Sequence, residues 1–255
     1  MIRKIFGRAP AIPTEGSSSV KVILLAAGTG KRLGARTKKT PKCLVPLGGG
    51  ENLLKRYFRS FRALGLKDIV LVVGHQKEMI LSEYVRTGRG LRIRSIENEE
   101  YEKGSLLSLF KASEELNEDC LIMDADVYFE TRSLKRLVDS KHPSSFLVDP
   151  RTKFTGEEMM VMTEGRRLKQ IAKKISPSLK MVGESVGFLK IRKNDAERLK
   201  NILADFVRRG KTGVEYEEAY NALMQQTAIG SEIITEFWTE MDFEEDLKTI
   251  MRRHH

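Results

Sequence analysis

A glycine-rich basic segment contains the residues best suited to phosphate chemistry. It follows an aliphatic run and reads Leu25-Ala26-Ala27-Gly28-Thr29-Gly30-Lys31-Arg32-Leu33-Gly34. Glycines let a backbone approach a phosphate closely, and successive N–H groups form a concavity that binds anions. Lys31 and Arg32 add positive charge to the same loop. The segment predicts a phosphate-binding loop, while a tight strand-to-loop turn would have a similar composition.

Two better-known phosphate loops do not fit the spacing of this segment. A Walker A loop that ended at Gly30-Lys31 would need glycine in place of Leu25 and a hydroxyl residue in place of Arg32. A dinucleotide-binding fingerprint that began at Gly28 would place its third glycine at Leu33 rather than at Gly34. The spacing therefore excludes both.

A second basic feature follows shortly after the glycines. It reads Thr40-Pro41-Lys42-Cys43-Leu44-Val45-Pro46-Leu47. The prolines on either side stiffen this loop and fix the direction of Lys42. A lysine held in this way can act as a point charge on a phosphate. Taken alone, Lys42 is equally explained as an ordinary surface lysine.

Acidic residues follow two of the apolar segments. Asp124 and Asp126 come directly after Cys120–Met123, and the period of an extended chain puts both carboxylates on one side. Such a pair suits Mg²⁺, which proteins bind through one or two carboxylates plus substrate phosphates. Asp242 is a further candidate near the C-terminus. A turn or helix cap would also explain these acids, and Asp242 could be the N-cap of a closing helix.

The elements that must position these residues alternate between strands and helices up to about residue 150. The expected strands are Val20–Ala27, Asp68–Val73, Leu91–Glu97 and Cys120–Met123, and the expected helices are 53–64, Gln76–Arg86 and Ser105–Leu116. Continuous aliphatic strands are typical of a parallel sheet that is buried on both faces. The pattern predicts an α/β fold with right-handed crossovers. In such a sheet, ligands bind beyond the carboxyl ends of the strands, where the candidate residues lie.

The pattern changes after about residue 150. We expect a hairpin, one long strand, two helices, a last strand and a closing helix, over Met159–Thr163 with Leu168–Lys173, Ser185–Ile191, Asp195–Phe206, Glu215–Gln225, Ile233–Trp238 and Phe243–Met251. Residues 1–19 are expected to form a flexible basic tail. Residues 20–255 are expected to form one domain.

Charge and composition narrow the function classes. The 255 residues carry a net charge of +10, and Val20–Ser60 holds ten basic residues against the single acid Glu51. Such a concentration can attract nucleic acid, an anionic membrane or a small polyphosphate. The longest apolar run, Val22–Ala27, is far too short to span a bilayer. The two cysteines form no disulfide framework. We expect a soluble, cytoplasmic protein without a transmembrane segment.

In combination, residues 20–255 resemble the nucleoside triphosphate transferase superfamily, also called the sugar-nucleotide pyrophosphorylases. LAAGTGKRLG followed by TPKCLVPL is similar to the signature of that superfamily, in the same order. Shorter stretches resemble a narrower branch, the cytidylyltransferases that act on phosphocholine and related small phospho-alcohols or phosphonates. These stretches are Asn98-Glu99-Glu100-Tyr101 with Ser108, Asp124-Ala125-Asp126-Val127, Gly183-Glu184-Ser185-Val186-Gly187, Glu215-Tyr216-Glu217 and Trp238–Leu247.

The resemblance implies a role for each matching position. The nucleotide would be held by Leu25, Ala26, Ala27, Gly28, Thr29, Gly30, Lys31, Arg32 and Ser108. Arg32 and Lys42 would contact the reacting phosphates as catalytic residues. Asp126 and Asp242 would hold Mg²⁺. Glu184, Tyr216 and Glu217 would face the acceptor, within a part of the domain contributed by about residues 151–230.

The resemblance also implies a fold and a reaction. The fold would be Rossmann-like, a mostly parallel mixed sheet flanked by helices, of the nucleotide-diphospho-sugar transferase type. The enzyme would transfer CMP from CTP to phosphocholine, phosphoethanolamine or 2-aminoethylphosphonate and release pyrophosphate, with no nucleic-acid partner. The alternatives are an inositol-1-phosphate or sugar-1-phosphate nucleotidyltransferase that uses CTP, UTP, GTP or dTTP, and a non-catalytic regulatory or nucleic-acid-binding relative. The sequence leaves open whether the chain is a monomer or a homodimer.

Overall fold

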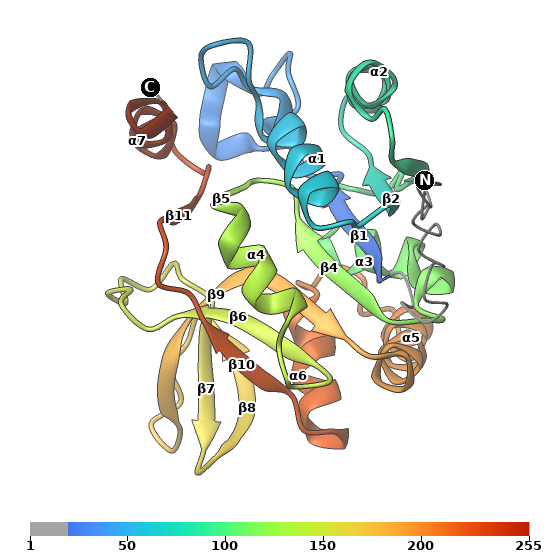
Figure 1. The fold of residues 1–255 in the computed structure, drawn as a ribbon. Helices are drawn as coiled ribbons and strands as arrows, with labels where there is room; N and C mark the ends of the chain where they lie inside the picture. The colour runs from blue at the N-terminus through green and yellow to red at the C-terminus, as the bar shows by residue number, and fades with distance from the viewer. Residues whose placement is uncertain (1–19, 255) are drawn as a thin grey trace, which may run out of the picture.

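A mixed nine-stranded sheet organises the protein, which we describe from a computed structural model over residues 20–254 (Figure 1). Seven strands follow the order β10-β6-β9-β4-β1-β2-β3, and β7 and β8 extend the sheet from β9. The strands are β1 (Lys21–Ala26), β2 (Asp68–Val73), β3 (Arg92–Glu97), β4 (Cys120–Asp124), β6 (Ser145–Asp149), β7 (Met160–Glu164), β8 (Arg167–Ala172), β9 (Lys180–Ile191) and β10 (Gly230–Ile233). The four strands β1 to β4 are parallel, and β9 runs antiparallel to both β4 and β6. The predicted α/β class with a mostly parallel mixed sheet is confirmed.

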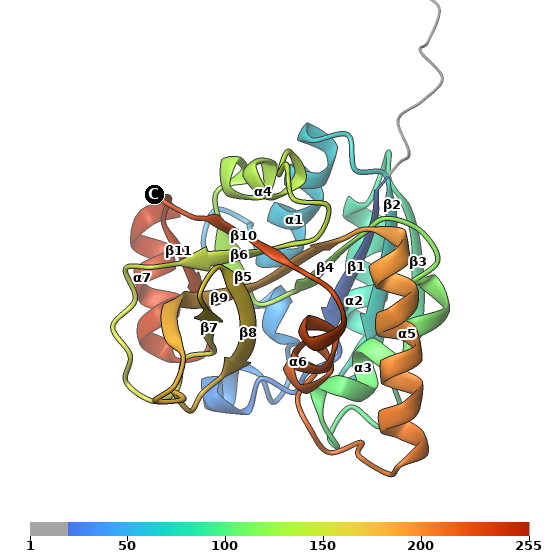
Figure 2. The same ribbon diagram turned by 90° about the horizontal axis from the view of Figure 1, so that it is seen from below.

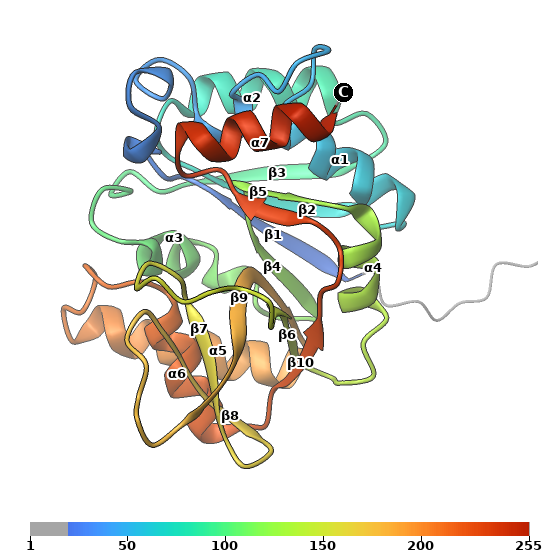
Figure 3. The same ribbon diagram turned by 90° about the vertical axis from the view of Figure 1, so that its left-hand side faces the viewer.

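Helices cover both faces of this sheet. They are α1 (Leu53–Ala63), α2 (Lys77–Thr87), α3 (Ser105–Lys111), α4 (Thr131–Val138), α5 (Lys193–Arg208), α6 (Glu217–Gln226) and α7 (Glu244–His254). α1 and α4 lie on the opposite side of the sheet from α5 and α6 (Figure 2). Figure 3 shows the same three layers from the side, with α1, α2 and α7 above the sheet and α3, α5 and α6 below it. None of these helices, all within residues 20–254, has the length and apolar character needed to cross a membrane.

Alternate side chains of β1 explain why two apolar layers form. Val22 and Leu24 pack with the layer of α1 and α7, whereas Ile23 and Leu25 pack with the layer of α3, α5 and α6. All six residues of β1 are buried. A strand that is covered on both faces is apolar along its length, which is the pattern of residues 22–26, and the buried Lys21 at its start forms ion pairs with Glu115 and Glu118.

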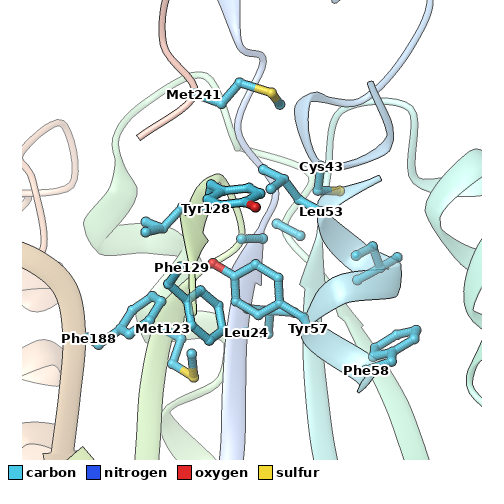
Figure 4. Packing of buried hydrophobic residues seen from close by; sticks show 14 of the residues in the cluster. Leu24, Cys43, Leu53, Tyr57, Phe58, Met123, Tyr128, Phe129, Phe188 and Met241 are labelled. Atoms are coloured by element: carbon cyan, nitrogen blue, oxygen red, sulfur yellow. The ribbon is translucent and has the colours of Figure 1, made fainter. Parts of the chain in front are cut away.

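An aromatic group fixes the carboxyl end of β4 against α1. Tyr57 from α1 packs edge-to-face on Phe129 with ring centroids 5.0 Å apart, and Phe129 packs on Phe188 of β9 at 5.1 Å (Figure 4). The Tyr57 hydroxyl donates a hydrogen bond of 2.5 Å to the backbone oxygen of Asp124. This hydrogen bond ties α1 to Asp124, the last residue of β4 and the first of the acidic pair.

The predicted last strand, Ile233–Trp238, is wrong. The chain forms two short strands there, β10 and β11 (Trp238–Glu240), which belong to different sheets. β10 pairs with β6, and β11 pairs antiparallel with β5 (Val127–Phe129). Ile234 is buried between them, so the apolar pattern continues although the chain changes partner.

Other differences between the predicted and the observed elements concern how far they extend and which were missed. The helix predicted over Ser105–Leu116 ends at Lys111 and is followed by a 3₁₀ turn at Ser113–Glu115. The prediction assigned no element to residues 127–150, which form β5, α4 and β6. The predicted tail over residues 1–19 lies outside the residues that the structure describes.

The order of the strands creates one crevice at the carboxyl edge. β1 has β2 on one side and β4 on the other, so the chain winds away from β1 in both directions. In open α/β sheets, ligands bind at such a topological switch point, beyond the carboxyl ends of the strands. The glycine-rich loop leaves β1 and the Asp124–Asp126 turn leaves β4 at this same place.

Candidate active site

A cavity of about 440 Å³ opens at the switch point between β1 and β4. Its lining includes all but one of the predicted site residues, namely Leu25, Ala27, Gly28, Thr29, Gly30, Lys31, Arg32, Lys42, Ser108, Asp126, Glu184, Tyr216, Glu217 and Asp242. They come from strands, helices and loops that are far apart in the chain. The fold therefore gathers the predicted residues around a single space.

Ala26 is the exception among the predicted residues. Its neighbours Leu25 and Ala27 line the cavity, but Ala26 packs with the opposite apolar layer of the sheet, together with Val22 and Leu24. The reason is the alternation of a strand, in which successive side chains point to opposite faces.

Gly30 lets the glycine-rich loop fold back on the Lys42 loop. Its φ of +63° lies in the left-handed region, and a Cβ there would meet the Thr37 methyl group at 2.9 Å and Cβ of Lys42 at 3.2 Å. The Thr37 hydroxyl donates a hydrogen bond of 2.7 Å to the Gly30 carbonyl oxygen. A side chain at position 30 would separate the two basic loops, so the glycine keeps Lys42 beside the glycine-rich loop.

At one end of the cavity, which we call the charge-paired end, two cations meet two carboxylates. The end consists of Arg32, Lys42, Asp126 and Asp242. Lys42 Nζ lies 2.6 Å from Asp126 Oδ2 and also donates to Asp242 Oδ1, and the Arg32 guanidinium pairs with Asp242 Oδ2. Burial lowers the pKa of Lys42, but the two carboxylates outweigh it and raise that pKa above its usual value. Lys42 is therefore a firmly charged ammonium.

Asp242 faces the cavity and does not serve as the cap of α7. The backbone N–H groups of Asp242 and Phe243 donate to the Asp246 carboxylate at 3.0 Å and 2.7 Å, so Asp246, in the first turn of α7, holds the segment that leads into the helix. The backbone N–H of Met241 donates to the Asp126 carbonyl oxygen at 2.9 Å. That bond ties the two acidic segments together and leaves both carboxylates directed at Lys42.

Asp126 and Asp242 are the two carboxylates that could hold a divalent cation. Both already contact one cationic group, the Lys42 ammonium. Within residues 20–254, no cluster of three or more His, Cys, Asp or Glu side chains is arranged for a metal ion. A metal at this position would therefore take its remaining ligands from substrate phosphates or water, which is the usual style of Mg²⁺ binding.

A second set of carboxylates, which we call the acid end, consists of Glu184, Glu217 and Glu240, and all three line the same cavity. Burial raises the pKa of Glu184 to about 7 and of Glu217 to about 7, and burial together with the nearby Asp126 and Asp242 charges raises the pKa of Glu240 to about 8. Thr152 donates a hydrogen bond of 2.7 Å to the Glu184 carboxylate, which opposes the rise. Among the residues that the structure describes, none of these three carboxylates forms an ion pair.

Asp124 also lines the cavity and meets residues from two other elements. The Tyr216 hydroxyl, just before α6, donates a hydrogen bond to Asp124 Oδ2. Burial and the nearby Asp126 charge raise the pKa of Asp124, while the bond from Tyr216 opposes that rise. Gly187 of β9 has a φ of +77°, and a Cβ there would lie 2.5 Å from Asp124 Oδ2. The glycine thus makes room for this carboxylate.

Hydrogen bonds join serines of α3 to neighbouring segments of the chain. The buried Asn98 amide donates a bond of 3.0 Å to Ser108 Oγ, which fixes the predicted nucleotide-site serine. Ser105 Oγ accepts a bond of 2.9 Å from the Tyr216 backbone N–H and donates to Glu215. The start of α3 is thereby joined to the start of α6, where Tyr216 and Glu217 lie.

Sequence reasoning assigned no role to Glu240, which is one of the acidic residues that line the cavity. Asp124 was recognised only as the first member of the acidic pair. Glu240 precedes Asp242 by two positions and lies on β11, so period-two alternation could have found it.

Comparisons with known proteins agree with this geometry. Residues 22–182 match the family described as MobA-like NTP transferase domain. A protein of Rubrobacter xylanophilus named bifunctional IPC transferase and DIPP synthase is 31% identical over 202 residues, which cover 72% of this chain and 45% of that protein. The chain thus spans under half the length of this curated relative.

Two solved structures share the fold. The CTP:phosphocholine cytidylyltransferase from Streptococcus pneumoniae has a TM-score of 0.75 at 20% identity and covers 93% of this chain and 100% of its own. The inositol-1-phosphate CTP transferase from T. maritima has a TM-score of 0.75 at 21% identity and covers 92% and 96%. Because the two scores are equal, the fold does not separate one acceptor from the other.

Proposed function

We propose, because this chain belongs to the family of MobA-like NTP transferase domains, that it transfers CMP from CTP to a small phosphorylated alcohol or phosphonate and releases pyrophosphate. The observation that carries the proposal is the convergence of Arg32, Lys42, Asp126 and Asp242 at one end of a single cavity. Cations and metal-binding carboxylates around one space are what a nucleoside triphosphate requires.

The reaction needs an anionic nucleophile and no general base. An oxygen of the acceptor phosphate attacks the α-phosphorus of CTP in line and forms the new P–O bond. The bond between the α-phosphorus and its bridging oxygen breaks, and pyrophosphate leaves with the electron pair. The second pKa of a phosphate monoester is about 6, so the nucleophile is already charged near neutral pH. Among the described residues, no histidine lines the cavity.

The chain contributes position and charge. Backbone N–H groups of Gly28, Thr29 and Gly30 bind phosphate oxygens, and Arg32 and Lys42 neutralise the charge that develops on the leaving group. Asp126 and Asp242 would hold Mg²⁺, because two carboxylates together with phosphate oxygens are a donor set that this ion accepts. When bound, the ion supplies positive charge to the α-phosphate and the leaving pyrophosphate.

The acid end supports an acceptor that carries an amine. Three carboxylates, of Glu184, Glu217 and Glu240, line that end without an ion pair within the part of the chain that the structure describes. A cationic head group would stabilise their ionised forms. Phosphocholine, phosphoethanolamine and 2-aminoethylphosphonate each place such a cation a few bonds from the reacting phosphate or phosphonate.

Inositol-1-phosphate is the second candidate acceptor. The likeness in fold to the inositol-1-phosphate CTP transferase from T. maritima equals the likeness to the phosphocholine enzyme, so this acceptor stays an alternative. Its hydroxyl groups could donate hydrogen bonds to the same carboxylates. The two candidates differ in charge, so an acceptor series separates them.

The test is a matrix of pyrophosphate release in the presence of Mg²⁺. It crosses CTP, UTP, GTP and dTTP with phosphocholine, phosphoethanolamine, 2-aminoethylphosphonate, inositol-1-phosphate and glucose-1-phosphate, and identifies each product by its mass. We expect release with CTP and an amine-bearing acceptor. The matched controls are Lys42→Ala, which should be inactive, and Lys38→Ala, an exposed lysine outside the cavity lining that should not be.

Other outcomes of this matrix would overturn different parts of the proposal. Reaction of CTP with inositol-1-phosphate alone would overturn the amine acceptor and keep the nucleotide. Reaction of glucose-1-phosphate alone, with UTP or dTTP, would overturn cytidylyl transfer itself.

A further inference from the structure

The Lys42 ammonium occupies the space between the two carboxylates assigned to the metal. It lies 2.6 Å from Asp126 Oδ2 and donates to Asp242 Oδ1, while the second oxygen of Asp242 accepts from Arg32. The Lys42 side chain is only 12% exposed, so water reaches little of it. The positive charge that these carboxylates need is supplied by the chain itself.

A divalent ion and this ammonium exclude one another. Two positive groups within a few ångströms repel strongly at the low effective dielectric constant of a partly buried site. An ion that binds Asp126 and Asp242 must therefore displace Lys42 or bind weakly beside it. The same repulsion acts between the two carboxylates when neither cation is present.

Lys42 has both the means to move and a place to go. Its backbone is fixed in the short 3₁₀ turn Lys42–Leu44, which follows Pro41. The ammonium is carried on a flexible four-carbon stem, so it can change partner while the loop stays in place. Lys31 and Arg32 line the same cavity, so a triphosphate bound there would lie within reach of the Lys42 side chain.

We propose that Lys42 is an exchangeable counter-ion that fills the metal position in the free protein and moves to the triphosphate when nucleotide binds. This inference rests on the proposed function, since it takes Asp126 and Asp242 as metal ligands. It means that metal and nucleotide bind as a cooperative pair and that the nucleotide-free protein holds metal poorly. By linkage, each of the two ligands must then raise the affinity for the other by the same factor.

The test measures Mn²⁺ binding to the nucleotide-free protein, from the electron paramagnetic resonance signal of the free ion. Lys42→Met is compared with the wild type and with Lys31→Met. Lys31 lines the same cavity, and no ion pair of Lys31 is found within the described residues, so its replacement removes one charge without vacating the metal position. We expect Lys42→Met to bind Mn²⁺ at least about tenfold more tightly than either other protein, as for a typical coupling between sites.

Thermal melting provides a second readout that does not depend on activity. In EDTA, Lys42→Met should melt below the wild type because its two carboxylates repel, and added Mn²⁺ should raise its midpoint more than that of the wild type. If Lys42→Met does not fold, Lys42→Gln takes its place, because its amide can still donate to a carboxylate but carries no charge.

The failures of the two proposals are distinguishable. Equal Mn²⁺ affinities of the wild type and the Lys42 variant overturn the counter-ion, even where the wild type releases pyrophosphate in a Mg²⁺-dependent reaction. Absence of that reaction with every nucleotide and acceptor overturns the proposed function. Tighter binding by Lys31→Met as well would show a general effect of charge and would also overturn the counter-ion.

Discussion

The charge-paired end and the acid end of one cavity differ in how the charge of their carboxylates is balanced. At the charge-paired end, Asp126 and Asp242 meet Lys42 and Arg32, and the negative charges are balanced within the chain. At the acid end, Glu184, Glu217 and Glu240 have no such partner among the described residues, and burial raises their pKa values toward neutrality. At the charge-paired end, the cationic side chains of Lys42 and Arg32 could exchange their carboxylate partners for an anionic ligand. The acid end holds carboxylates that burial keeps closer to their neutral form.

The largest expected effect comes from breaking the charge-paired end. Lys42→Ala and Asp126→Ala should each lower kcat at least about 30-fold, because one lost contact to developing charge costs about 2–4 kcal/mol in the transition state. The measurement is pyrophosphate release at saturating CTP and acceptor, with circular dichroism to show that each variant is folded. Wild-type turnover in folded Asp126→Ala would contradict the metal assignment.

The charge-paired end was predictable because its signals are local. The glycines, the proline-flanked Lys42 and the acids after Cys120–Met123 each show their chemistry within a few residues, and the carboxyl edge of a parallel sheet brings them together. The family resemblance and the sheet built on these motifs are confirmed.

The acid end was predictable only in part. Glu240 depends on the pairing of β11 with β5, and the apolar pattern around Ile234 concealed the change of sheet that creates β11. The sequence shows a glycine at Gly187 but not why a glycine is needed there. A side chain at this position would collide with the Asp124 carboxylate, which approaches from another strand. Contacts of this kind are set by tertiary packing, which periodicity does not report.

The next effect tests the bond from Tyr216 to Asp124, which joins the start of α6 to the end of β4. Tyr216→Phe leaves a buried carboxylate without its donor and should lower the free energy of unfolding by about 1–3 kcal/mol. Urea denaturation measures it. The matched control is Tyr220→Phe, because Tyr220 is also buried, within α6, and its hydroxyl forms no hydrogen bond with the residues described. Equal losses in the two variants would show that the bond to Asp124 contributes nothing specific.

A smaller effect sharpens the role of the acid end in choosing an acceptor. Glu184→Gln keeps an oxygen that accepts from Thr152 but removes the charge. We expect KM for phosphocholine to rise about tenfold, as for the loss of a charged interaction, with KM for inositol-1-phosphate nearly unchanged. Glu157→Gln is the control, since Glu157 lines the same cavity but is exposed and pairs with Lys173. A similar rise for both acceptors would refute selection by charge.

The smallest effect concerns stability, and its sign follows from the pKa of Glu217. Burial raises that pKa from an ordinary value near 4.5 to about 7, so the folded protein binds a proton that the unfolded chain releases between these values. The stabilisation from Glu217 is therefore complete below about pH 4.5 and is lost as pH rises through about 7. Glu217→Gln, which cannot ionise, should gain about 1 kcal/mol over the wild type between about pH 5 and about pH 6, as buried unpaired charge is removed. Urea unfolding at the two pH values measures the difference, and Glu218→Gln, exposed on the same helix, should show none. If the gain of Glu217→Gln did not grow with pH, the acid end would not hold its carboxylates away from ionisation, and its contrast with the charge-paired end would fail.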